Sequence, residues 1–578
     1  MWDSSDVSIS DKKKQPSSYL KVWKILTVVS VVLTLVAVTV TAVLIWYVLS
    51  NKSELECNKQ RDTNIEDTLE CPQLPTLLPL PKPRPERITE IFQKLESALN
   101  ALVDKESSLP AISMNVFYQD EILWSGHFGS KVYKQPGKKP NDSTVYRIGS
   151  VTKIFPVLMM YKFYEEGKIS SIDDPLSKYA PNFFVKNPYT NENITLREIA
   201  SQMSGLPREA PCLFSCNTTS AEQLALLKNR SLILPPWVQP SYSNLGYGLL
   251  GRLLTESLLQ NETFESWTQE NILKPLGMIN TGFKITDEVK KNMAFPYLSK
   301  GKIMPFMEIG WLAPAGQMYS TIDDLVKLGM MFTQPEKQKL FKPATLREMM
   351  TPKDITPDGV TLWGSPFEMV FKEHVLVRVK EGHIDTYDAK LIVIPELALG
   401  ANILMSSIDY VKQHASEVST LLYNLLIPRL NETLFELQRE LNFPIDPAPY
   451  TGKFQIKKTN SVFGTIRTYN VTISEHQNYL VAATPHSSST TEIRYIGETL
   501  VFRARSRYPG ASCFMERSGT LANMYFDPPR KDNLSHGFHI PQWEVVAKRV
   551  KAMSDSYADE SENNMEEFMF NPFKRAML

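Results

Sequence analysis

Apolar and polar positions alternate with clear periods along this 578-residue chain. A helix is predicted over 88–104, where apolar residues recur at spacings of three and four. Residues 111–130 alternate, break at Gln119-Asp120 and alternate again, which predicts a β-hairpin. Helices and turns follow from 150 to about 330, and β-branched runs return over 375–407. We expect an α+β domain over 88–435, in which the later strands complete an antiparallel sheet that the first strands begin.

Residues 25–49 form an uncharged, mostly apolar run that is long enough to cross a bilayer as a helix. Five lysines precede the run, and Glu54 and Glu56 soon follow it, so we expect residues 1–24 in the cytoplasm and the rest outside. We therefore expect residues 25–49 to be an uncleaved signal anchor of a type II membrane protein. A cleavable signal peptide is the alternative, but its apolar region would be shorter, about 7–15 residues.

Two further regions have distinct patterns. Residues 71–87 are dense in proline, and we interpret 50–87 as a stalk, of which fifteen extended residues would span about 45 Å. The alternative is a proline-rich loop packed on the domain. Residues 446–550 show short strands between turn residues, which predicts a separate small β domain. Residues 551–578 are acidic and then apolar, and we expect a mobile tail, with a docking peptide as the alternative.

Composition narrows the classes of function. The formal net charge is zero, without an extended basic run, which argues against nucleic acid as a partner. Five cysteines are present, of which Cys57–Cys71 and Cys212–Cys216 are the nearest pairs, with Cys513 left over; the pairing itself stays open. No pair has zinc-ligand spacing, so we expect no metal site. The sequence has nine N-x-S/T glycosylation candidates, at Asn51, Asn141, Asn193, Asn217, Asn229, Asn261, Asn431, Asn470 and Asn533.

Ser150 and Lys153 stand three residues apart in "YRIGSVTKIFPV". If a helix begins here, both side chains lie on one face, with the positive end of the helix beside the serine. A lysine buried against the hydroxyl would supply a neutral amine as a base. The alternative is an ordinary amphipathic helix with a serine N-cap, because S-x-x-K also occurs by chance.

Two further motifs in the sequence favour a catalytic role for Ser150 and Lys153. "SYSNLGYGLLG" places Tyr242 and Asn244 in a Y-x-N arrangement, and "EGHIDTY" supplies His383 between predicted strands. In this order the motifs resemble the serine β-lactamase and penicillin-binding protein superfamily, which has S-x-x-K, Y-x-N and then K-T-G or H-x-G. The resemblance covers roughly residues 100–425 and is closest to the class C-like branch. The segment 446–550 also resembles an accessory domain of some members.

The resemblance implies a role for each matching residue. Ser150 would form an acyl-enzyme, Lys153 and Tyr242 would transfer protons, and Asn244 would hold Lys153 and a substrate amide. The oxyanion would bind the backbone N–H of Ser150 and one after His383, at or near Thr386. No cofactor is implied. The partners implied are a small-molecule or peptide acyl substrate and the membrane, without nucleic acid.

Three departures from the family pattern stand out. His383-Ile384-Asp385 has an aspartate where H-x-G has glycine, and the link from His383 to Pro395 is a few residues short. We expect Asp385 to oppose a substrate carboxylate. Pro156 lies past the first turn of the expected catalytic helix and predicts a kink there. "QMSGL" at 202–206 stands where "HTSGL" is usual.

The sequence therefore predicts a membrane-anchored, extracytoplasmic serine hydrolase that cleaves an amide or ester through an acyl-enzyme. A module that has lost catalysis and binds a peptide or receptor is the alternative, which Asp385 and the short link favour. An α/β-hydrolase is excluded by the lack of a G-x-S-x-G motif.

Overall fold

A computed structural model describes residues 74–105, 109–212, 216–298, 301–408, 414–440, 446–460, 462–476, 479–485, 490–495, 500–507 and 521–550. The expected tail at 1–24, the anchor at 25–49 and the C-terminal tail at 551–578 lie outside these residues. Within the described ranges no helix has both the length and the apolar character of a membrane span. The chain forms two compact units, one of residues 73–441 and one whose described part is 446–550.

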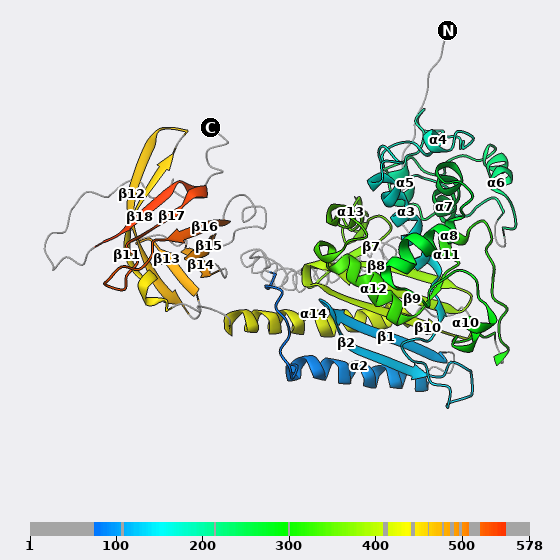
Figure 1. The fold of residues 1–578 in the computed structure, drawn as a ribbon, viewed down its shortest axis with the longest axis horizontal. Helices are drawn as coiled ribbons and strands as arrows, with labels where there is room; N and C mark the ends of the chain where they lie inside the picture. Colours follow the sequence, from blue (N-terminus) through cyan, green and yellow to red (C-terminus); the bar gives the residue numbers. More distant parts are fainter. Residues whose placement is uncertain are drawn as a thin grey trace, which may run out of the picture. The chain divides into compact units, whose positions relative to one another are not determined.

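An antiparallel sheet of eight strands in the order β2-β1-β10-β9-β8-β7-β6-β5 organises the larger unit (Figure 1). β1 pairs with β10 from Ala111 opposite Ser406 to Tyr118 opposite Leu399, so strands from both ends of the unit share one sheet, as the sequence predicted. The strands are β1 (Ala111–Tyr118), β2 (Glu121–Gly129), β5 (Asp354–Ile355), β6 (Thr361–Trp363), β7 (Glu368–Lys372), β8 (Val375–Ile384), β9 (Tyr387–Ile394) and β10 (Leu399–Ser406). A small second sheet pairs β3 (Tyr146–Arg147) with β4 (Tyr319–Ser320).

The two faces of the large sheet are covered differently. α2 (Glu86–Lys105) and α14 (His414–Glu440) bury one face, and the helical body buries the other (Figure 1). The helical body contains α3 (Ile154–Glu165), α4 (Leu176–Tyr179), α5 (Leu196–Ala200), α6 (Ser220–Leu227), α7 (Asn244–Leu258), α8 (Phe264–Thr268), α9 (Lys274–Leu276), α10 (Asp287–Lys291), α11 (Ala313–Gly316), α12 (Ile322–Thr333) and α13 (Pro343–Met349). Its core includes the side chains of β8 at even positions, such as Leu376, whereas Val375, Val377 and Val379 face α2 and α14.

The described part of the proline-rich segment lies on the domain. The hydroxyl of Tyr118 donates to the carbonyl of Leu78 over 2.7 Å, and Arg84 forms a 2.8 Å ion pair with Glu121. Leu80 is buried in the α2–α14 core. The stalk predicted over 50–87 is therefore wrong for residues 74–87, because their backbone and apolar side chains find partners on the β1–β2 hairpin. The packed-loop alternative holds for this part.

The second unit contains a closed antiparallel barrel, and each strand pairs with the next along the chain. Its strands are β11 (Gly452–Asn460), β12 (Thr465–His476), β13 (Tyr479–Ala483), β14 (Thr490–Tyr495), β15 (Val501–Arg507), β16 (Leu521–Phe526), β17 (Gly537–Ile540) and β18 (Val545–Arg549). Closure comes from β11 pairing with β18. Five aromatic side chains, Tyr450, Phe454, Phe502, Phe526 and Phe538, pack against one another inside it.

Candidate active site

Ser150 lies in a short 3₁₀ helix, Gly149–Lys153, that leads directly into α3. The sequence predicted one helix from Ser150 onward, with Pro156 beyond its first turn. The change from 3₁₀ to α geometry at Lys153–Ile154 instead puts Pro156 in the first turn of α3, where the lack of an N–H costs little. The expected kink at Pro156 therefore has no basis. The Ser150 side chain is half-buried, so the hydroxyl is within reach of solvent.

Lys153 is fully buried and its ammonium has three acceptors. Its Nζ lies 2.9 Å from Oγ of Ser150, 2.8 Å from Oδ1 of Asn244 and 2.7 Å from the carbonyl oxygen of Ala315. Burial lowers the pKa of Lys153, helped by the charge of Lys380 and opposed by Tyr242. A neutral amine would donate its two hydrogens to Asn244 and Ala315 and turn its lone pair to the hydroxyl of Ser150. This geometry suits a general base.

Tyr242 precedes α7 and lies among three cations. Nζ of Lys153 is 4.9 Å from the centre of its ring, Nζ of Lys380 is 5.5 Å away, and the guanidinium of Arg208 is 5.0 Å away. Burial acts to raise the pKa of Tyr242, but Lys153, Lys380 and a hydrogen bond with Ser150 outweigh it, and the pKa falls below its ordinary value. The phenol is therefore placed and tuned to exchange a proton with Ser150 and Lys153.

Asn244 is the first residue of α7, and the hydroxyl of Ser243 caps the helix by accepting from the N–H of Gly246. The Asn244 side chain reaches Lys153 through Oδ1, and its Nδ2 donates to both carboxylate oxygens of Glu209, at 2.9 and 3.0 Å. The expected bond from Nδ2 to a substrate amide therefore competes with Glu209. Glu209 could not be predicted from the sequence, because it lies thirty-five residues before Asn244 and belongs to no motif.

Strand β8 runs past the serine, and its alternation decides which residues face it. A Cβ added at Gly382 would come within 2.7 Å of the Ser150 nitrogen and 2.0 Å of the Ile148 carbonyl oxygen. Only glycine therefore fits against the 3₁₀ helix at this position. Successive side chains on a strand point to opposite faces, so Lys380 shares the face of Gly382.

His383 lies on the other face, which corrects its predicted role. Its Nε2 is 3.0 Å from Oδ1 of Asp388, the residue opposite it on β9, and Oδ2 of Asp388 accepts from the N–H of Ala415 at the start of α14. This hydrogen bond raises the pKa of His383. The imidazole is thus directed to the α14 side of the sheet, and the structure contradicts a catalytic role for it.

Lys380, Glu381 and Gly382 form the third motif instead. They read K-x-G, in agreement with K-T-G at the first and third positions. The segment between the third motif and Pro395 looked a few residues short when it was counted from His383. Counted from Lys380 it is three residues longer, which accounts for the difference. The sequence itself contains this K-x-G pattern, three residues before the histidine that matched H-x-G.

Two backbone N–H groups are placed to bind an oxyanion. One is that of Ser150. The other is that of His383, whose nitrogen would lie 2.6 Å from a Cβ added at Gly149. Along an antiparallel strand, backbone N–H groups point alternately to the two neighbouring strands. The N–H of His383 points to the β7 side of β8. Val379 is the last residue of β8 that pairs with β7, so this N–H has no strand partner there. Thr386, predicted for this role, lies three residues on in the β8–β9 turn, and its carbonyl accepts from Ser407.

Asp385 does not enter the site as expected. Its carboxylate pairs with Arg147 at 2.7 Å, and both side chains are fully buried. Arg147 also donates to the carbonyl of Met307, 2.7 Å away. The prediction that Asp385 opposes a substrate carboxylate is therefore wrong, because the charge is turned inward and paired.

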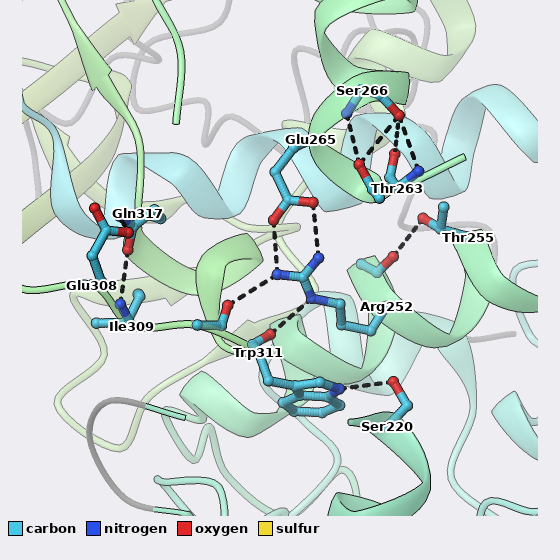
Figure 2. A network of polar contacts seen from close by, with 12 residues as sticks. Ser220, Arg252, Thr255, Thr263, Glu265, Ser266, Glu308, Ile309, Trp311 and Gln317 are labelled. Carbon is cyan, nitrogen blue, oxygen red and sulfur yellow. Dashed lines mark hydrogen bonds and ion pairs between the residues drawn. The ribbon is translucent and has the colours of Figure 1, made fainter. Parts of the chain in front are cut away.

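The segment that carries Ala315 is held by α7 (Figure 2). Nε and Nη2 of Arg252 donate to the carbonyls of Trp311 and Gly310, at 3.0 and 2.9 Å, while Glu265 binds the guanidinium with both oxygens. The Trp311 indole donates to Ser220 over 2.8 Å. These contacts fix the chain just before the carbonyl that accepts from Lys153.

The structure joins Cys212 and Cys216 in a disulfide, one of the nearest pairs noted in the sequence; Cys57, Cys71 and Cys513 lie outside the described residues. Seven of the glycosylation candidates are exposed, Asn431 is half-buried, and Asn51 lies outside the described ranges. Within those ranges no group of three metal-binding side chains is found.

Comparisons with known proteins agree with this geometry. The family model "Beta-lactamase" matches residues 92–410. A Homo sapiens protein described as beta-lactamase-like 1 is 31% identical over 496 residues, 82% of this chain and 96% of that one. An octameric penicillin-binding protein homologue from Pyrococcus abyssi shares the fold with a TM-score of 0.51 and 20% identity, over 79% of this chain and all of that one. A class C β-lactamase has a TM-score of 0.50 and 19% identity, over 58% and 96% of the two chains. The chain belongs to the β-lactamase family of serine hydrolases.

Proposed function

We propose that this protein is a serine hydrolase that cleaves an amide or ester through an acyl-enzyme on Ser150. The observation that carries the proposal is the environment of Lys153: a fully buried Nζ with a lowered pKa, 2.9 Å from the serine hydroxyl and fixed by two further acceptors. An ordinary amphipathic helix would not bury a lysine in this way. Tyr242 and the two oxyanion donors complete what acyl transfer needs.

The reaction follows from these positions. Oγ of Ser150 bonds to the substrate carbonyl carbon while its proton passes to the Lys153–Tyr242 pair. The N–H groups of Ser150 and His383 hold the oxyanion. The bond to the leaving group then breaks, and the pair returns the proton to the leaving amine or alkoxide. Water then gives a proton to the same pair and bonds to the acyl carbon. The bond from that carbon to Oγ breaks, the pair returns the proton to Oγ, and a carboxylic acid and free Ser150 result.

We also propose that residues 25–49 anchor the chain as a type II membrane protein, with the hydrolase unit outside the cytoplasm. The charge asymmetry around this run and the position of all nine glycosylation candidates after it support the proposal. The substrate would then be an extracytoplasmic small molecule or peptide with an acyl group.

The test is intact-mass spectrometry of the chain from Leu74 onward, after incubation with a fluorophosphonate and separately with a penicillin. We expect a fluorophosphonate adduct on the wild-type protein and none on Ser150→Ala. A folded wild-type protein that neither reagent labels would contradict the proposal and favour the binding module. One support of that alternative, Asp385 as a substrate-facing charge, is already removed by its pairing with Arg147.

A further inference from the structure

Lys380 is a buried ammonium that forms an ion pair with Glu368. Its side chain is 1% exposed, and its Nζ donates to Oε1 of Glu368, 2.5 Å away at the start of the neighbouring strand β7. Among the residues that the structure describes, Glu368 is the ion-pair partner found for it. The second carboxylate oxygen of Glu368 is buried and has no hydrogen-bond partner there, so the carboxylate is committed to this one lysine.

The pair lies beside the proton-transfer residues. Nζ of Lys380 is 5.5 Å from the centre of the Tyr242 ring, and Glu368 interacts electrostatically with Tyr242 and Lys153. Other ionisable groups act on this cluster. Tyr247 on α7 and Arg208 over the Tyr242 ring face it, and Glu381 raises the pKa of Lys380 from the other face of β8.

Glu381 offers a matched comparison. It forms an ion pair with Lys390 across β8 and β9 on the face of the sheet that α14 covers, and Lys390 also contacts Ser419 of α14. The same strand thus takes part in two glutamate–lysine pairs. One lies beside Tyr242, and the other lies on the face opposite Ser150.

We propose that Glu368 is a positioning residue of this active site, whose carboxylate holds Lys380 beside Tyr242 with its positive charge. The proposal rests on the proposed function. A buried ammonium that loses its ion-pair partner is destabilised and more readily gives up its proton. Glu368 therefore acts on the reaction through Lys380 and does not touch the reacting atoms.

The direction of the effect on pH dependence follows. Burial alone would lower the pKa of Lys380, but Glu368 outweighs it and the pKa lies above its ordinary value. Glu368 also acts to raise the pKa of Lys153 and of Tyr242. Without Glu368 the pKa of Lys380 falls, and the pKa values of Lys153 and Tyr242 fall as long as Lys380 keeps its charge. The Lys153–Tyr242 pair then becomes a base at lower pH, and Lys380 loses its charge at lower pH.

The experiment compares Glu368→Gln with Glu381→Gln in the full-length chain, by the rate constant for fluorophosphonate labelling of Ser150 between about pH 5 and 10. For Glu368→Gln we expect both limbs of the profile to move to lower pH, with labelling roughly tenfold slower at the alkaline end. Glu381→Gln should move the limbs much less, because Glu381 raises the pKa of Lys380 less than Glu368 does. Glu368→Asp, which retains the charge, should restore most of the alkaline limb.

The possible outcomes distinguish a failure of the role of Glu368 from a failure of the proposed function. Labelling of folded Glu368→Gln with unchanged limbs would overturn the role of Glu368 while leaving the serine hydrolase intact. If Glu368→Gln does not fold, Glu368→Asp decides. A small residual shift of its alkaline limb to lower pH supports the role of Glu368, and limbs with no shift at all would overturn it. A wild-type chain that is unlabelled at every pH would overturn the proposed function, and this inference with it.

Discussion

The guanidinium of Arg147 and the carboxylate of Asp385 form an ion pair of 2.7 Å in which neither side chain is exposed. The pair ties β3 to the turn between β8 and β9, three residues beyond Gly382, which packs on the serine. Asp385 has a φ of +52°, a conformation that asparagine and aspartate tolerate better than most residues. The aspartate is therefore a structural partner where H-x-G would have placed a glycine.

Asp385→Asn should destabilise the protein by about 3–5 kcal/mol, because it leaves the Arg147 charge buried without compensation. Asparagine keeps the shape and the backbone conformation, so the loss reports the charge. Urea unfolding measures it. The double variant Arg147→Met/Asp385→Asn should lose less than the sum of the single variants, and simple additivity would contradict a direct pair.

His383→Gln should keep the fluorophosphonate labelling rate within roughly threefold, since the backbone N–H and not the imidazole serves the site. Its effect should be on stability. The hydrogen bond with Asp388 raises the pKa of His383 above 6.5, so the imidazolium stabilises the fold fully below that ordinary value and loses this contribution as pH rises through the folded pKa. Unfolding measured at several pH values should show a slope that the variant lacks. Loss of labelling in a folded variant would return the side chain to the site.

Lys153→Arg and Lys153→Met should both slow labelling of Ser150 by about 10²–10⁴-fold, because neither side chain can act as a neutral amine base. Arginine stays charged at all accessible pH values and does not fit the three acceptors of a single Nζ. Circular dichroism serves as the control for folding. Labelling of Lys153→Arg near the wild-type rate would assign the base to Tyr242 alone.

Glu209→Ala should slow labelling roughly tenfold, whereas Glu209→Gln should have a smaller effect, because only the glutamine keeps an oxygen that accepts from Nδ2 of Asn244. Because the Glu209 carboxylate accepts from Nδ2 of Asn244, it directs Oδ1 of the same amide to Lys153. Without an acceptor at Glu209 the Asn244 amide can rotate and exchange the positions of Oδ1 and Nδ2. Rates for the two variants at one pH are sufficient. Equal losses would instead point to the negative charge of Glu209 as the property that matters.

Asn431 should carry no glycan when the chain is made in a secretory host, in contrast to exposed candidates such as Asn141 and Asn193. Its side-chain oxygen is buried within α14, so a sugar there would have to displace packed neighbours. Peptide mass spectrometry before and after glycosidase treatment reports each site. Full occupancy at Asn431 would contradict the placement of α14.

Much of the site could be predicted from the sequence, because its parts are local. Ser150 and Lys153 stand one helical turn apart, and Tyr242 and Asn244 lie together at the start of one helix. The order of these short motifs, which resembles that of a known family, gave the prediction. The sheet was also predicted, since strands precede and follow a helical body along the chain, an order that suggests one shared sheet.

The remainder depends on register and on contacts across the fold. Lys380 and His383 are three residues apart, an odd number, so on a strand they face opposite sides, and choosing the wrong one reverses the assignment. Glu368 and Glu209 meet Lys380 and Asn244 only in three dimensions. The proline-rich segment has the composition of a spacer, and its binding surface on the β1–β2 hairpin has no signature in its own residues.

The pairing of β1 with β10 also sets the order in which the catalytic machinery comes together during translation. A ribosome that has made Ser150 and Lys153 must add more than two hundred further residues before His383 and its N–H exist, and β1 waits longer still for residues 399–406. Closing so long a loop is slow. The nascent chain thus contains Ser150 well before the strand that packs against it, and the proposed acylation of Ser150 is disfavoured until the unit is complete.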